Sequence, residues 1–236
     1  FHADLRIGQL LDALDRLNLT NNTLVIFSSD NGPARMTREV ALKKMHDTAT
    51  GEGYNIAAAK GITGGRKGYK ASLFEGGIGV PFIARWPGKI AAGKVDRTSI
   101  FSAVDLLPTF CEIAKVKLPD SYNPDGSSQL ATLLGQGQAL REKPLFWKTL
   151  SARPVSRLMP NHWAAYVVVH KNWKLVTDQS TQHIELYDLV KDPLEKNNLA
   201  EKNKAIVDHL KKMLVDWQGT LPAKPTGKVF SSLRKS

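Results

Sequence analysis

The feature that most constrains the fold is an apolar run, residues 24–27, that leads directly into the polar sequence Ser-Ser-Asp-Asn-Gly-Pro. Four consecutive apolar residues between turn signals predict a buried strand. Before them, apolar residues recur at intervals of three and four from Ile7 to Leu17, which predicts an amphipathic helix. A helix, a short turn and a buried strand make half of an alternating α/β pattern. The polar end of this strand is either an ordinary turn or a ligand site, because open α/β sheets bind ligands at the carboxyl ends of their strands.

The rest of the chain divides into two regions of different pattern. Residues 79–88, Gly-Val-Pro-Phe-Ile-Ala-Arg-Trp-Pro-Gly, predict a second buried strand, and residues 98–116 predict a helix that Pro108 kinks or divides. After about residue 140, four short strand-like runs, a hairpin turn at His-Lys-Asn and a helix over residues 204–217 follow. We therefore predict an α/β fold. Residues 1–140 would belong to a large α/β domain, and residues 141–236 would form a small C-terminal α+β subdomain, an antiparallel sheet plus a helix, with a basic tail.

The composition is strongly basic, with 33 lysines and arginines against 22 aspartates and glutamates and a formal net charge of +11. This balance suits an anionic partner or substrate, and it equally suits a lysine-rich solvated surface. Basic patches interleaved with aromatic residues do not occur, so the sequence predicts no nucleic-acid partner. No apolar run reaches the roughly 18 residues that a membrane-spanning helix needs, so we expect no membrane span.

The chain contains a single cysteine, Cys111, and so offers neither a disulfide framework of its own nor a cysteine-based metal cluster. Its neighbours include apolar residues at helical spacing. Because reactive thiols need a polar, cationic setting, we predict that Cys111 is a buried structural thiol.

Two candidate sites for chemistry stand out. Asp30 and Asn31 offer a carboxylate and an amide oxygen, hard donors suited to calcium or magnesium, although Asp-Asn-Gly is also a common turn. Downstream, Arg66, Lys67 and Lys70 lie among glycines that let a backbone approach a ligand closely. Such a loop can bind an oxyanion through ammonium groups and amides, or it can be a solvated basic loop.

Glu75 precedes two glycines at the start of the second predicted strand. Two roles are open for this carboxylate: a structural group that fixes the loop, or a general base. The structural role is the one we predict.

Several motifs, taken in order, resemble the C-terminal portion of the sulfatase family, arylsulfatase-like enzymes of the alkaline-phosphatase-like superfamily. These motifs are NTLVIFSSDNGP, KASLFEGGIGVPFIARWPG, VDLLPTFCEIA and, near the end, NWKLV with IELYDLVKDPLEKNNL. The resemblance extends over nearly the whole chain, and it implies the C-terminal part of a sulfatase fold and a sulfuric ester hydrolase activity.

The resemblance also implies roles for three residues. In sulfatases the Asp-Asn pair of the SDNG motif helps to bind a divalent cation, usually calcium, with magnesium as the alternative. Asp30 and Asn31 would therefore be metal ligands. The lysine five residues before the glutamate of EGG contacts the sulfate and its bridging oxygen, and this residue is Lys70. One position departs from the family pattern: relatives commonly carry arginine in EGGIRVP where this chain has Gly79, which affects a local salt bridge or the loop orientation.

Other parts of the family's active site have no counterpart in the sequence. The nucleophile of sulfatases is a formylglycine made from the Cys or Ser of a CxPxR or SxPxR motif, and neither motif occurs here. We therefore expect the chain to be a truncated sulfatase whose N-terminal half carries the formylglycine and the remaining metal ligands. Such a fragment is expected to be inactive alone, and the resemblance implies a periplasmic or secreted protein.

The substrate stays open at this point. The resemblance implies either a sulfated small molecule or a sulfated glycan, with specificity set by variable loops such as residues 36–63, which include His46. Two other functions also stay open: a phosphodiesterase or phosphonate hydrolase of the same superfamily, and a noncatalytic sulfatase-like protein that binds acidic glycans.

Overall fold

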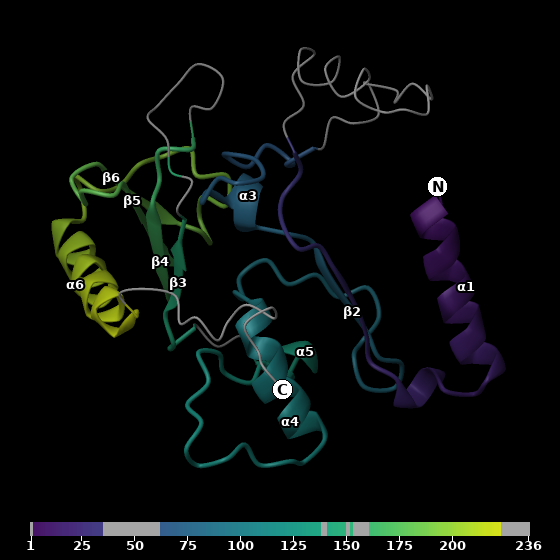
Figure 1. Cartoon of the computed structure of the whole chain (residues 1–236). Coiled ribbons are helices and arrows are strands. Elements are labelled where there is room, and N and C mark those ends of the chain that lie inside the picture. The colour runs from purple at the N-terminus through teal and green to yellow at the C-terminus, as the bar shows by residue number, and fades with distance from the viewer. Residues whose placement is uncertain (1, 35–61, 138–140, 150–151, 153–160, 223–236) are drawn as a thin grey trace, which may run out of the picture.

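The computed structural model describes residues 2–34, 62–137, 141–149, 152 and 161–222. Several predictions concern parts of the chain outside these residues. They are the predictions about His46, most of the loop at residues 36–63, the basic tail and the subdomain boundary at residue 140. Figure 1 shows a four-stranded sheet with helix α6 on one side and the short helix α3 on the other, while the N-terminal helix α1 stands apart.

The C-terminal part is an antiparallel sheet with strand order β3-β4-β5-β6. Its strands are β3 (Leu145–Lys148), β4 (Tyr166–His170), β5 (Trp173–Thr177) and β6 (Ile184–Asp188), and all four were predicted. His170 pairs with Trp173 across a two-residue turn in which Lys171 has a φ of 55°, so the predicted hairpin is confirmed. Two-residue turns that contain a residue of positive φ match the twist of antiparallel strands.

Both faces of this sheet are covered, and the side chains alternate between them as the pleat requires. Helix α6 (Lys204–Thr220) was predicted and covers one face. The core beneath it includes Val168, Leu175, Leu186, Leu210 and Leu214, each at most 1% exposed. The opposite face packs against the glycine-rich loop before and within α3 (Glu75–Ile78). There the buried residues include Leu73, Phe74, Val167, Val176 and Tyr187.

The middle of the chain forms a turn η2 (Ala103–Asp105) that leads into helix α4 (Leu106–Ile113), followed by a short helix α5 (Leu130–Leu133). The prediction of one helix over residues 98–116 is wrong at both ends. Ser102 and Asp105 form a capping box, which starts the helical segment there. Pro108 lies in the first turn of α4, where a backbone N–H has no helical partner in any case, so the proline suits the start of this helix.

Cys111 lies on α4 and is half-buried, not buried as predicted. The reason is the incomplete cover of α4: Leu107 and Phe110 on the same helix are both more than 40% exposed in the described structure.

The N-terminal part consists of helix α1 (His2–Arg16), turn η1 (Thr20–Asn22) and strand β1 (Val25–Ser28). Strand β1 pairs antiparallel with β2 (Phe82–Arg85). Helix α1 and both strands were predicted, but the predicted burial of the strands is wrong. Phe27 is 44% exposed and Ile83 is 60% exposed, because the face on which these two residues pair stays open in the described structure.

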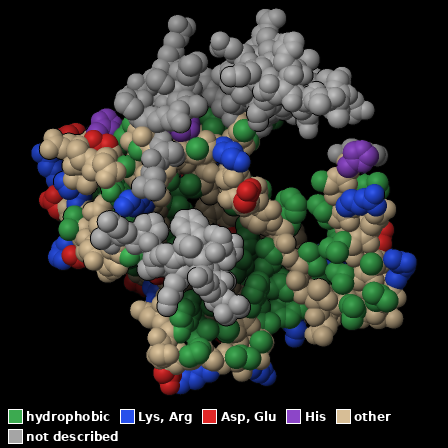
Figure 2. Space-filling model, in the orientation of Figure 1, with side chains coloured by type: hydrophobic (Ala, Val, Ile, Leu, Met, Phe, Trp, Pro, Cys, Tyr) green, Lys and Arg blue, Asp and Glu red, His purple; other side chains and the backbone are tan. Residues whose placement is uncertain are grey.

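Helix α1 has no buried residue, although its sequence is amphipathic. Figure 2 shows hydrophobic side chains gathered along α1 and over the region of β1 and β2. None of the described helices is both long enough and apolar enough to cross a membrane.

Candidate functional site

The turn after β1 docks onto the glycine-rich loop that carries the candidate lysines. Gly32 donates its backbone N–H to the carbonyl of Gly77 at 2.8 Å, and Lys70 donates its own to the carbonyl of Pro33 at 2.9 Å. A Cβ at Gly32 would lie 2.0 Å from the carbonyl oxygen of Gly76, so only glycine permits this approach. Two segments about forty residues apart, both singled out in the sequence, therefore meet through their backbones.

Asp30 and Asn31 lie at the start of this docked turn. Asp30 is exposed, and its carboxylate has no hydrogen-bond partner among the described residues. Asn31 donates from Nδ2 to the carbonyl of Gly32 at 2.9 Å, which turns its amide nitrogen toward the backbone. The amide oxygen makes no hydrogen bond with the described part of the chain. One carboxylate and one amide oxygen are hard donors, and both are available for a cation.

These two oxygens fit a calcium or magnesium ion only as part of a ligand set. Calcium takes six to eight oxygen ligands and magnesium six. Across the ranges that the structure describes, no three His, Cys, Asp or Glu side chains come together to complete such a set.

Lys70 is exposed, and its ammonium has no ion-pair partner among the described residues. Its backbone, in contrast, is held on both sides. The N–H bonds to Pro33, and the carbonyl accepts from His162, whose Nε2 lies 3.2 Å away. A carbonyl only accepts, so His162 carries its proton on Nε2. Sequence reasoning missed His162, since no motif or spacing links it to Lys70.

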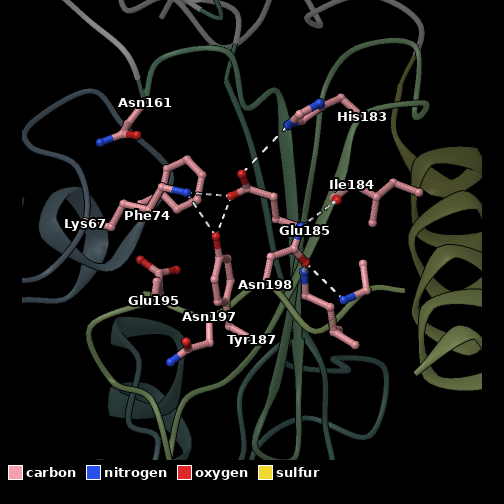
Figure 3. Close-up of polar contacts among 12 residues, drawn as sticks. Lys67, Phe74, Asn161, His183, Ile184, Glu185, Tyr187, Glu195, Asn197 and Asn198 are labelled. Atoms are coloured by element: carbon pink, nitrogen blue, oxygen red, sulfur yellow. Dashed lines mark hydrogen bonds and ion pairs between the residues drawn. The ribbon is translucent and has the colours of Figure 1, made fainter. Parts of the chain in front are cut away.

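Lys67, three residues earlier, is not available to an oxyanion. Its Nζ lies 2.7 Å from Glu185 Oε2, 2.9 Å from the Tyr187 hydroxyl and 4.2 Å from the centre of the Phe74 ring. Figure 3 shows the Lys67 side chain directed toward Glu185 and Tyr187. Burial and the Glu185 carboxylate raise the pKa of the Tyr187 phenol. The hypothesis that Lys67 binds an anionic ligand is therefore wrong, because a carboxylate of β6 already pairs with it.

Glu75, as predicted, is a structural residue. Its Oε1 lies 2.8 Å from Lys174 Nζ on β5, and Lys174 lies 2.8 Å from Oε1 of Glu195 as well. Glu195 also accepts the backbone N–H of Glu75 at 2.6 Å. Lys174 and the side chain of Glu195 are fully buried, so the three residues form a closed cluster.

Burial acts on the two buried charges of this cluster in opposite ways. Burial alone would lower the pKa of Lys174, but the carboxylates of Glu75 and Glu195 outweigh it and the pKa lies above its ordinary value. Burial raises the pKa of Glu195, and the contact with Lys174 offsets only part of this effect. Both pKa shifts have the same direction, so Lys174 and Glu195 each hold a proton more tightly than the same group does in water.

Gly79 leaves room for this arrangement. A Cβ at position 79 would lie 2.5 Å from Glu75 Oε2 and 2.7 Å from the Glu75 carbonyl oxygen. The departure from the arginine of the family pattern thus coincides with a glutamate whose side chain extends along its own helix toward residue 79 and pairs with Lys174.

Comparison with known families agrees with this combination of motifs. The family model "N-sulphoglucosamine sulphohydrolase, C-terminal" matches residues 66–220, and the model "Sulfatase" matches residues 2–116. The chain belongs to the sulfatase family. It corresponds to the C-terminal portion of sulfatases, as the resemblance implied.

Two curated relatives illustrate the range of this family. The chain is 30% identical to N-acetylgalactosamine-6-O-sulfatase of Bacteroides thetaiotaomicron over 220 residues, which cover 89% of this chain and 39% of that protein. It is 33% identical to human steryl-sulfatase over 216 residues, which cover 83% of this chain and 34% of that protein. The chain therefore spans little more than a third of the length of these sulfatases.

Solved structures show the same fold. A Bacteroides thetaiotaomicron protein from work on the metabolism of multiple glycosaminoglycans matches with a TM-score of 0.66 and 29% identity, over 92% of this chain and 43% of that one. Ps i-CgsB, solved in complex with k-i-k-neocarrahexaose, matches with a TM-score of 0.67 and 25% identity, over 89% and 40% of the two chains. The fold is thus that of the C-terminal part of an α/β sulfatase, as predicted.

Proposed function

We propose that this chain supplies part of the active site of a metal-dependent sulfatase that hydrolyses sulfate esters. The observation that carries the proposal is the docking of the Asp30–Asn31 turn onto the loop of Lys70, in a chain whose family is that of the sulfatases. The two candidate metal ligands and the candidate sulfate-binding lysine are held in one region by backbone hydrogen bonds at Gly32 and Pro33.

In this proposal Lys70 binds the sulfate group and balances charge on the departing oxygen. Cleavage of a sulfate ester places negative charge on the leaving oxygen, and an ammonium held nearby stabilises that charge. The ammonium of Lys70 is exposed and has no ion-pair partner in the described part of the chain, which suits this role, whereas that of Lys67 is already paired. Lys70 is fixed at its backbone, so its side chain extends from a defined point.

Asp30 and Asn31 would hold a divalent cation, calcium or magnesium, together with ligands from another part of the protein. Such a cation acts as a Lewis acid toward sulfate oxygens. The nucleophile, a formylglycine in this family, would likewise come from an N-terminal portion. We call the chain together with that portion the intact protein.

The exposed apolar surface of α1, β1 and β2 supports this arrangement. Apolar patches of this kind are unusual on a free surface and mark contact with other protein. The matched sulfatases are more than twice as long as this chain, so their N-terminal portion is the partner that we propose for it. The same contact would bring the missing ligands to Asp30.

We propose a sulfated glycan as the substrate class. One relative is named for N-acetylgalactosamine 6-O-sulfate and one neighbour was solved with k-i-k-neocarrahexaose, and the net charge of +11 suits a polyanion. Comparing N-acetylgalactosamine 6-sulfate with a steroid sulfate tests this choice. Faster hydrolysis of the steroid sulfate would contradict it.

The test of the reaction compares 4-nitrophenyl sulfate with the diester bis(4-nitrophenyl) phosphate as substrates of the intact protein, before and after removal of divalent cations. We expect hydrolysis of the sulfate ester and loss of that activity on chelation, with recovery on addition of calcium. Faster hydrolysis of the phosphate ester would favour the phosphodiesterase alternative. Binding of sulfated glycan without hydrolysis of either ester would favour a noncatalytic binder.

Calcium binding gives a second test that does not depend on turnover. Because Asp30 and Asn31 are only part of a ligand set, calorimetry should show weak or no calcium binding by this chain and tight binding by the intact protein. Asp30→Ala should remove the tight site, while Asp216→Ala on α6 should not. Tight, stoichiometric binding to this chain alone would contradict the partial site.

A further inference from the structure

Lys70 lies between two points at which its loop is attached to the C-terminal sheet. Lys67, three residues before it, contacts β6, and Glu75, five residues after it, contacts β5. Both contacts cross more than ninety residues of sequence and join the region of the candidate site to strands that lie far downstream. The NWKLV and IELYDLVKDPLEKNNL motifs of the sequence supply the partners on the sheet.

The first attachment is the pairing of Lys67 with Glu185. Three interactions hold the ammonium: the ion pair at 2.7 Å, the hydrogen bond from Nζ to the Tyr187 hydroxyl at 2.9 Å, and the position over the Phe74 ring. Tyr187 also donates to Glu185, so the carboxylate binds two donors at once. Figure 3 shows these three polar groups converging in front of the sheet.

The second attachment is the buried cluster of Glu75, Lys174 and Glu195. Lys174 lies 2.8 Å from a carboxylate oxygen of each glutamate. Glu195 additionally accepts the first N–H of helix α3, at Glu75. This contact fixes the end of the loop in position and direction, because both the side chain and the backbone of Glu75 are bound.

The backbone between these attachments is strained next to the candidate lysine. Ala71 has a φ of 69°, in the left-handed region that non-glycine residues rarely adopt. Such a conformation persists only where surrounding contacts hold it in place, and strain of this kind tends to occur at functional sites. The attachments at Lys67 and Glu75 flank this residue on both sides.

We infer that Lys67 and Lys174 are positioning residues for Lys70: their contacts with the C-terminal sheet hold the strained loop so that the Lys70 ammonium faces the sulfate group. The inference rests on the proposed role of Lys70. The C-terminal subdomain then takes part in catalysis through the placement of a residue in the large domain, without touching the substrate through these two lysines.

The test measures kcat and KM of the intact protein with 4-nitrophenyl sulfate for Lys174→Met and Lys67→Met. Displacement of a catalytic group by about 1 Å costs on the order of 100-fold in rate, so we expect kcat to fall by about 10- to 100-fold in each variant. Lys67 is partly exposed, so Lys67→Met is the milder change and keeps the test open if Lys174→Met does not fold.

The decisive comparison repeats Lys174→Met and Lys67→Met in a Lys70→Ala background. Residues that act through Lys70 lose their effect once Lys70 is gone, so each change should then alter kcat by less than about twofold. Equal losses in both backgrounds would overturn the inference while leaving the role of Lys70 intact. If Lys70→Ala itself leaves kcat unchanged, the proposed function fails instead.

Arg141→Met is the matched control. Arg141 and Asp105 form another buried ion pair, at 2.6 Å, with side chains 1% and 0% exposed. The Asp105 side chain otherwise binds the backbone N–H groups of Ser102 and Ser127, away from the loop of Lys70. This variant should lower stability yet keep kcat within about twofold below its unfolding temperature. An equal loss of kcat here would also overturn the inference.

Discussion

The C-terminal sheet and the N-terminal segment of this chain differ sharply in how they bury apolar residues. Strands β3–β6 are covered on both faces, and Val167, Leu175 and Leu186 have no exposed surface. Helix α1 has no buried residue, and the β1–β2 pair leaves Phe27 and Ile83 largely exposed. Both regions have the apolar periodicity of core elements, but only one has its partner in the described structure.

This difference separates the part of the chain that buries its own apolar residues from the part that, in our proposal, contacts the N-terminal portion. The candidate site lies at the border between the two regions. Lys70 belongs to a loop fixed to the C-terminal sheet, while Asp30 and Asn31 follow strand β1 of the exposed region. Within this chain, Lys70 is therefore the part of the candidate site that contacts with the packed C-terminal sheet hold in place.

The largest expected difference concerns ion pairs of the two regions. Lys174→Met leaves the buried carboxylate of Glu195 and the partly buried carboxylate of Glu75 without their partner, and it should lower the free energy of unfolding by about 3–5 kcal/mol. In the N-terminal segment, Asp15 lies 3.9 Å from Arg85 at the surface, and Asp15→Asn should cost less than about 1 kcal/mol. Chemical denaturation of both variants measures the two values. Similar losses in the two variants would contradict the difference in burial between the two regions.

Truncation of apolar side chains comes next. Leu186→Ala in β6 should cost about 2–5 kcal/mol, because it opens a cavity beneath α6. Leu10→Ala in α1, where the side chain is 56% exposed, should change the free energy of unfolding of this chain by at most about 0.5 kcal/mol. Thermal or urea unfolding checks both. A large cost at Leu10 would mean that α1 is packed in solution.

Ile83 tests whether the exposed face is an interface. In this chain Ile83→Ala removes a side chain that is 60% exposed, so the cost should be small. If the N-terminal portion covers β2 in the intact protein, the same change should cost about 1–3 kcal/mol there. Parallel denaturation of the two proteins measures the difference. Equal small costs would count against the proposed contact.

The smallest effect concerns alkaline stability of the C-terminal region. The pKa of Tyr187 lies above its ordinary value of 10.0. Its contribution to stability is therefore complete below pH 10 and is lost as the pH rises toward the raised value, since the unfolded chain releases its proton first. The raised pKa of Lys174 acts in the same direction above 10.5.

As the pH rises above these ordinary values, the contribution of each group to the free energy of unfolding should fall by up to about 1.4 kcal/mol per pH unit. Tyr187→Phe should make this decline shallower. Tyr122→Phe is the control, because Tyr122 is exposed and lies outside the contacts of Lys67 and Glu185. Urea unfolding at a series of alkaline pH values measures the slope. An unchanged slope in Tyr187→Phe would contradict the effect.

Much of the fold could be predicted from sequence because its elements are local. Short strand-like runs identified β3–β6, helical spacing identified α1, and the helix predicted over residues 204–217 corresponds to α6. The burial of β1 and β2 could not be predicted, since it depends on what covers the strands and not on their own residues. The start of α4 was missed because a capping box at Ser102 and Asp105 outweighs the apolar pattern before it.

The candidate site could be predicted only as a set of residues. Lys67 and Lys70 are three residues apart in one basic loop, and composition gives no reason to separate them. Their difference comes from Glu185, more than a hundred residues downstream, which pairs with one and not the other. The contact of His162 with Lys70 likewise depends on tertiary structure.

The most direct test of the central claim is the rate of 4-nitrophenyl sulfate hydrolysis by the intact protein with Lys70→Ala, beside Lys89→Ala as an exposed lysine elsewhere. Loss of a group that stabilises charge in the transition state costs about 100- to 1,000-fold in kcat, and we expect such a loss for Lys70→Ala alone. A Lys70→Ala rate close to that of the unaltered protein would contradict the role of this loop in the sulfatase site.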